Sequence, residues 1–372
     1  MILRIFGWSF GVTVVAFAGA FILGGPTALA LVAILSVLEI SLSFDNAVVN
    51  ATILERMNPF WQRIFLTVGI LIAVFGMRLL FPLLIVGVTA SLNPVEAVRL
   101  ALDGGAVSQP GTYANLLQAA HPSIAAFGGM FLFMLFLDYI FEDREITWLT
   151  WLERPLARLG KLDQLSVVVG LAVLVITAQF LAKDPGAVMI AGTLGAVTYL
   201  LVNGLGSFFE GVGEQEEDTA EGGTEGSGGP TRLAKVSGRA AFFLFLYLEV
   251  LDASFSFDGV IGAFAITQDI FIIAVGLGVG AMYIRSLTVY LIRKGTLYDY
   301  VYLEHGAHWA IGALAVILFI SIKTEIPEVV TGLIGVGFIG AAFLSSLARN
   351  RRGPDANQPG QPDHAKAVHA SG

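Results

Sequence analysis

Long apolar stretches, each separated from the next by a few polar residues, run along almost the whole chain. Stretches of about 20 apolar residues have the length that an α-helix needs to cross the hydrocarbon core of a bilayer. The pattern therefore predicts an all-α polytopic membrane protein with about ten transmembrane helices. The expected spans are 5–23, 27–54, 60–88, 121–141, 165–182, 186–208, 238–268, 269–292, 305–322 and 327–347.

The polar breaks between these stretches predict an orientation. Most of the 21 Lys and Arg residues fall in alternate loops, among them Arg56, Arg154 and Arg239. Cytoplasmic loops retain basic residues, so we expect both termini to be cytoplasmic and the protein to lie in the inner cell membrane. All five Trp residues also fall near span ends on that side, as residues of the membrane interface do.

The composition agrees with this class and narrows the chemistry. Of 372 residues, 56% are hydrophobic and only 13% are charged, which is too apolar for a water-soluble globule of this size. The chain has no cysteine and five histidines. Disulfides, thiolate metal sites and cysteine nucleophiles are therefore excluded, and a bound metal would be held mainly by oxygen.

One short motif occurs twice inside the apolar sequence. EISLSFDN at 39–46 and DASFSFDG at 252–259 share the spacing of acid, Ser, Ser, Phe and acid. The motif spans, 27–54 and 238–268, are the second and the seventh of the ten, so the two copies are inverted relative to each other. Inverted repeats that enclose a substrate site near the membrane midplane are the plan of many secondary transporters.

Polar segments divide the chain into four parts. Residues 1–208 hold six expected helices, which form the first half and the start of the second. Residues 209–237 are acidic and glycine-rich, and we expect a disordered cytoplasmic linker. Residues 238–348 hold the other four helices, and 349–372 form a polar tail that we also expect to be disordered and cytoplasmic.

Carboxylates in the motif spans predict a cation site. Each such group costs about 2.5–3.5 kcal/mol on insertion scales, so it normally faces a partner, a cavity or a bound cation. Five acids lie in these spans, whereas the interiors of the spans that follow carry Arg78 and Arg285, which could clamp the acids of their own halves or act as gates. Carboxylate, hydroxyl and amide oxygens suit Mn²⁺, Mg²⁺ or Ca²⁺. The predicted ligands of a transported divalent cation are Glu39, Asp45, Asn46, Glu249, Asp252 and Asp258.

A straight helix cannot aim both acids of one motif at a single small ligand. Glu39, Ser43, Asn46 and Asn50 form one polar stripe, whereas Asp45 points more than about 100° away from it. Either the helix is broken near Ser43 to Asn46, and at the matching position of the second copy, or the two acids have different neighbours.

A second candidate site lies near the cytoplasmic ends of the fourth and ninth spans. Glu304, His305 and His308 have metal-ligand character, with Glu304 and His308 one helical turn apart, and Asp138 lies at the same level. These residues are either a cytoplasmic access site for the cation or ordinary hydrogen-bonding residues.

The repeated motif, with an arginine-bearing helix after each copy, resembles the TerC family of integral membrane proteins. That family is named for tellurite resistance and is grouped with the lysine-exporter superfamily. The segments 127–129 (FGG) and 304–308 (EHGAH) extend the resemblance to about half of the chain. It implies metal-ion efflux with Mn²⁺ as the leading substrate, and it implies Asp45, Asn46 and Asp258 as core site residues. Gly259, in place of the commoner Asn, departs from the family pattern, as do the extra spans.

Two rival functions remain open from the sequence. Asp45 and Asp258 could share a proton as an intramembrane aspartyl protease does, but the Tyr-Asp and Gly-x-Gly-Asp motifs of that chemistry do not occur at these positions. A non-transporting scaffold would bind soluble stress-response proteins through the linker or tail and leave the buried acids unexplained. We therefore expect a transporter rather than an enzyme, without a prosthetic group or a nucleic-acid partner, whose partners are the cation and the lipid bilayer.

Overall fold

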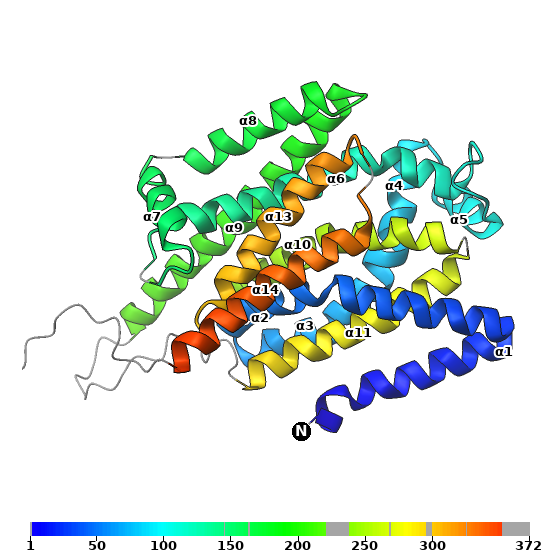
Figure 1. The fold of residues 1–372 in the computed structure, drawn as a ribbon, viewed down its shortest axis with the longest axis horizontal. Coiled ribbons are helices and arrows are strands. Elements are labelled where there is room, and N and C mark those ends of the chain that lie inside the picture. The colour runs from blue at the N-terminus through cyan, green and yellow to red at the C-terminus, as the bar shows by residue number, and fades with distance from the viewer. Residues whose placement is uncertain are drawn as a thin grey trace, which may run out of the picture.

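The computed structural model describes residues 2–144, 146–162, 164–220, 238–267, 269–294, 300–324 and 326–351. These residues form helices and short connections without a strand, which confirms the all-α class (Figure 1). The helices are α1 (Ile2–Leu42), α2 (Phe44–Arg56), α3 (Pro59–Leu71), the π-helix η1 (Ile72–Leu80), α4 (Phe81–Thr89), α5 (Pro94–Asp103), α6 (Tyr113–Phe141), α7 (Thr150–Leu159), α8 (Leu165–Phe180), α9 (Pro185–Ala220), α10 (Gly238–Ile266), α11 (Ile270–Lys294), α13 (Leu303–Ser321) and α14 (Glu328–Arg351).

Seven of the described helical stretches are long and apolar enough to cross a membrane. They lie in α1, α3 with η1 and the start of α4, α6, α9, α11, α13 and α14. The first two expected spans fall in α1 and α2, because α1 consists of two arms. The other expected spans are α8, which has 16 residues, and α10, which carries the acids of the second motif. Every expected span is therefore helical, although fewer than ten meet the criterion of length and hydropathy.

The two arms of α1 form a hairpin. Gly25 has φ 70° and ψ −165°, a backbone conformation that a side chain would strain, and Pro26 follows it. Proline lacks the N–H that would continue the hydrogen bonds of the preceding helix. The chain therefore reverses here, and the second arm of α1 runs back along the first (Figure 1).

The first motif helix is broken, as its polar pattern predicts. The second arm of α1 ends at Leu42, Ser43 has φ −100° and ψ 16°, and α2 begins at Phe44. The second motif has no matching break, because α10 runs through Gly259 as one helix. This leaves the other alternative, different neighbours for the two acids, for the second copy. A glycine inside a helix costs only about 1 kcal/mol relative to alanine, whereas each backbone group left unbonded in the membrane costs several kcal/mol.

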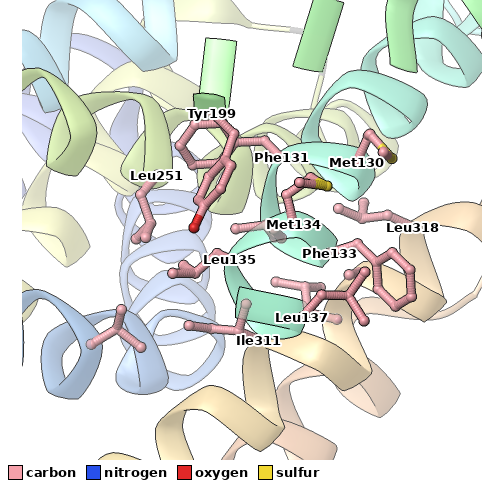
Figure 2. Close-up of a cluster of buried hydrophobic side chains, with 14 of the residues drawn as sticks. Met130, Phe131, Phe133, Met134, Leu135, Leu137, Tyr199, Leu251, Ile311 and Leu318 are labelled. Atoms are coloured by element: carbon pink, nitrogen blue, oxygen red, sulfur yellow. The ribbon is translucent and has the colours of Figure 1, made fainter. Parts of the chain in front are cut away.

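Helix α6 lies at the centre of the largest hydrophobic core. It packs against α9, α13 and α10, and more of its apolar window is buried than in the α1, α9 or α14 spans. Figure 2 shows Phe131 and Met134 of α6 among side chains of neighbouring helices, including Tyr199 of α9, Leu251 of α10 and Ile311 of α13. This core joins helices of both halves around one central helix.

The described helices extend into the expected polar segments. α9 continues to Ala220, so the first part of the expected linker 209–237 is helical, and α14 continues to Arg351. The Glu and Gln residues at 214–217 are good helix formers, which explains why the helix outlasts the apolar stretch. Residues 221–237 and 352–372 lie outside the described residues.

Candidate functional site

A buried ion pair lies beside the break in the first motif helix. Glu39, at the end of the second arm of α1, pairs with Arg78 of η1, and the two residues are 1% and 4% exposed. Arg78 also donates from Nη1 to the carbonyl oxygen of Ala73, at 2.5 Å. Ser43 at the break donates to Glu39 Oε1 at 3.1 Å. Glu39 is therefore held by the serine at the break and by Arg78 of η1 in the same repeat.

The second repeat holds the corresponding pair. Arg285 of α11 contacts Asp252 Oδ2 at 3.4 Å, and the same nitrogen lies 3.8 Å from Glu249 Oε1. Both acids are in α10 and are 5% exposed. The Cζ atom of Arg285 lies 3.7 Å from the ring centroid of Phe65, a residue of the first repeat. Two acids thus share one guanidinium at this site.

The two ion pairs match by their positions in the repeat. Asp252 and Arg285 are the counterparts of Glu39 and Arg78, and in each repeat the arginine contacts the acid of its own repeat. A buried charge is strongly unfavourable without a compensating partner. The arginines therefore act as clamps on the acids in this conformation, which is one of the two roles left open by the sequence.

Both ion pairs lie where the two repeats touch. A Cβ atom at Gly280 of α11 would lie 2.5 Å from Glu39 Cβ, and one at Gly259 of α10 would lie 3.3 Å from Glu39 Oε2. In the reverse direction, a Cβ atom at Gly69 of α3 would lie 2.7 Å from Glu249 Oε1. Glycines thus let each repeat bring its backbone against an acid of the other.

The remaining expected ligands are located only in part. Asn46 of α2 is 3% exposed. Asp45 is the second residue of α2 and Asp258 lies within α10, but their side chains are not among those described. Among the described side chains, no three His, Asp or Glu residues lie close enough together to hold a metal ion. The described part of the site is two clamped ion pairs with one acid in excess.

The residues of the expected access site have separate partners. Asp138 accepts a hydrogen bond from Tyr199 at 2.6 Å, and Glu304 pairs with Arg144 at 3.4 Å. His308 Nδ1 lies 2.8 Å from the carbonyl oxygen of Glu304, and its ring stacks on Tyr139 with centroids 3.6 Å apart. His305 Nδ1 lies 3.3 Å from Glu153. In this conformation the four residues do not converge on one point.

Glu153 is the central residue of this region, and the sequence analysis did not single it out. Its carboxylate accepts hydrogen bonds from the backbone N–H groups of Trp148 and Leu149 and from Nε1 of Trp309. Burial would raise the pKa of Glu153, but the contact with His305 and the hydrogen bonds from the Leu149 backbone and Trp309 outweigh it and lower the pKa to about 2. Glu153 thereby attaches α7 to α13, at one end of the bundle (Figure 1).

A small cavity adjoins this attachment. Its volume is about 20 Å³, enough for a water molecule, and its walls include Arg144, Glu153 and His305. Arginines and carboxylates both line it, so its charges largely cancel. The cavity therefore gives no support to a cation site at the ends of α6 and α13.

Comparison with known proteins identifies a family but no activity. No curated protein and no solved structure matches the chain. A family model described as "Protein of unknown function (DUF475)" matches residues 44–353. The match begins at the first residue of α2, directly after the break, and extends past the end of α14. Since the match covers most of its length, the chain belongs to the DUF475 family of proteins of unknown function.

Proposed function

We propose that this protein is a secondary transporter that exports a divalent metal cation, Mn²⁺, through a carboxylate site between two inverted repeats. One observation carries the proposal: buried acid–arginine pairs of both repeats lie where the repeats touch, with glycines pressed against the acids. Sites between inverted repeats near the membrane midplane are the plan of many secondary transporters.

The charge balance of the site supports a cation as the substrate. Glu39, Glu249 and Asp252 face only two guanidinium groups among the described residues. Asp45 of α2 and Asp258 of α10 add two further acids to the two motifs. An excess of buried negative charge is unfavourable unless a cation or protons neutralise it. Oxygen ligands favour hard divalent ions, and the TerC resemblance favours Mn²⁺ among them.

The proposed cycle uses the close contact between the repeats. The cation binds from the cytoplasm, the repeats rock about the acids, and the cation leaves on the other side, with protonation of the carboxylates as the step that releases it. In this proposal the protein lies in the inner membrane with both termini cytoplasmic, and it performs no covalent chemistry.

Metal binding can be tested before transport is measured. A ligand that binds only the folded state raises the melting temperature, so millimolar Mn²⁺ should stabilise the purified protein. Replacement of both Asp45 and Asp258 by Asn should abolish this shift, whereas Asp184→Asn, an exposed carboxylate at the start of α9, should leave it unchanged. A melting temperature indifferent to Mn²⁺, Mg²⁺ and Ca²⁺ would favour an enzyme or a scaffold instead.

A further inference from the structure

The two repeats differ in the buried polar residues that flank their ion pairs. Glu249 of the second repeat has Ser36 as its counterpart in the first, and Asn50 of the first repeat has Ala263 as its counterpart in the second. All four residues are less than a tenth exposed. Because the repeats are inverted, Glu249 and Asn50 lie on one side of the ion pairs, and their counterparts Ser36 and Ala263 lie on the other side.

Asn50 and Glu249 lie toward the same end of the bundle. We call this the linker end, because α2 and α9 end and α3 and α10 begin there. A buried apolar cluster, which we call the linker-end cluster, lies at this end. Asn50 is one turn before a member of this cluster in α2, and Glu249 is one turn after a member in α10. The members of the linker-end cluster are Leu54, Met57, Phe65, Ala241, Phe245 and Leu248.

The polar atoms on this side lack hydrogen bonds to the described protein. Asn50 is 0% exposed, and neither its amide oxygen nor its amide nitrogen has a hydrogen-bond partner among the residues that the structure describes. Neither carboxylate oxygen of Glu249 accepts a hydrogen bond within the described residues; Arg285 is 3.8 Å away. Buried polar groups are normally hydrogen-bonded, so such groups point to a ligand or to water.

Their counterparts on the other side are satisfied or apolar. Ser36 donates to the carbonyl oxygen of Val32 at 2.7 Å and lies 3.0 Å from that of Gly276. Ala263 packs inside an apolar cluster with Leu35 and Phe264. The polar atoms at these positions on the far side of the ion pairs thus already have hydrogen bonds. Burial does not explain the difference in hydrogen bonding between the two sides, because all four residues are buried.

We propose that Asn50 and Glu249 form a cation-binding vestibule between the central ion pairs and the linker-end cluster. A divalent cation that has partly lost its water binds there through the Asn50 amide oxygen and the Glu249 carboxylate before it reaches the central acids. This inference rests on the proposed transport function. It adds a second cation-binding site, which lies only on the linker-end side of the ion pairs.

Asn50→Leu tests the vestibule, because leucine has the branched shape of asparagine and removes both polar atoms. The assay is Mn²⁺ uptake into proteoliposomes. We expect a KM at least about tenfold above wild type, the loss typical for a group that supports a metal ligand, measured at equal amounts of folded protein. Asn50→Asp, which keeps oxygen ligands, should retain uptake.

Thr52→Val is the matched control on the same helix. It also replaces a polar group by an apolar one of similar size, but the Thr52 hydroxyl only donates to the carbonyl oxygen of Val49, at 2.7 Å. Thr52→Val should transport like wild type. Wild-type KM in Asn50→Leu overturns the vestibule, and so does loss of uptake in Asn50→Asp, which keeps the oxygen ligands. Absence of uptake by wild type overturns the transport function itself, and the vestibule with it.

Discussion

The carboxylate of Glu39 lies against the backbone of Gly259, where a Cβ atom would stand 3.3 Å from Glu39 Oε2. The two residues belong to different repeats and come from α1 and α10. Glu39 is already held by Arg78 and Ser43, so it has little freedom to move away. This contact explains why the second motif ends in Asp-Gly and not in Asp-Asn.

Gly259→Ala should therefore gain none of the stability that alanine normally brings to a helix. Gly340→Ala is the matched control, because nothing lies within 4 Å of a Cβ at that position of α14. Alanine in place of glycine stabilises a helix interior by roughly 0.5–1 kcal/mol, so Gly340→Ala should raise the melting temperature. Gly259→Ala should leave it unchanged or lower it. An equal rise in both variants would contradict the contact.

The Glu39–Arg78 pair should behave as a coupled unit in melting experiments. Arg78→Met leaves a buried carboxylate without its cation, which typically costs about 3–5 kcal/mol, so its melting temperature should fall sharply. The double variant Arg78→Met with Glu39→Gln should recover much of this loss because no unpaired charge remains. If the two substitutions were additive, the pair would not be coupled and the clamp assigned to Arg78 would be wrong.

The attachment of α7 should be insensitive to pH over the neutral range. The pKa of Glu153 is lowered from 4.5 to about 2, so its stabilising contribution is complete above the unfolded value and is lost as the pH falls toward 2. Hydrogen exchange of residues 148–160 should therefore be equally protected at pH 5 and pH 8 after correction for the intrinsic rate.

Glu153→Gln provides the comparison for that experiment. It removes the charge from a carboxylate that accepts two backbone N–H groups and the Trp309 indole, and hydrogen bonds to a charged group contribute about 1.5–3 kcal/mol. Exchange in α7 should be faster in this variant at pH 8. Protection that changes in wild type between pH 8 and pH 5 would show that another group controls the attachment.

The sequence predicts the helices well, because they depend on local pattern. Apolar length places every expected span in a helix, and the angular mismatch of Glu39 and Asp45 predicts the break at Ser43. For the second motif the sequence left two alternatives, a break or different neighbours for its acids, and α10 has no break. Gly259 lies instead against Glu39 of the other repeat. No pattern within one helix can show such a contact.

The polar residues at the ends of α6 and α13 also make contacts between helices that the sequence pattern does not show. His305 and His308 have the spacing of metal ligands, but the structure pairs His305 with Glu153, 152 positions earlier in the chain, and stacks His308 on Tyr139. Asn50 is a different case, since its place on the polar stripe is visible in the sequence. Only the structure shows that both of its polar atoms lack a partner among the described residues.

Mn²⁺ export through a site that contains Asp45 and Asp258 can be measured as Mn²⁺ uptake into inside-out membrane vesicles. The vesicles contain wild type, the Asp45→Asn/Asp258→Asn double variant or the Asp184→Asn control. We expect rapid uptake by wild type and the control, and loss of uptake in the double variant at equal expression. Equal uptake by wild type and the double variant would contradict the assigned site, and wild-type uptake no faster than in vesicles without the protein would contradict Mn²⁺ export.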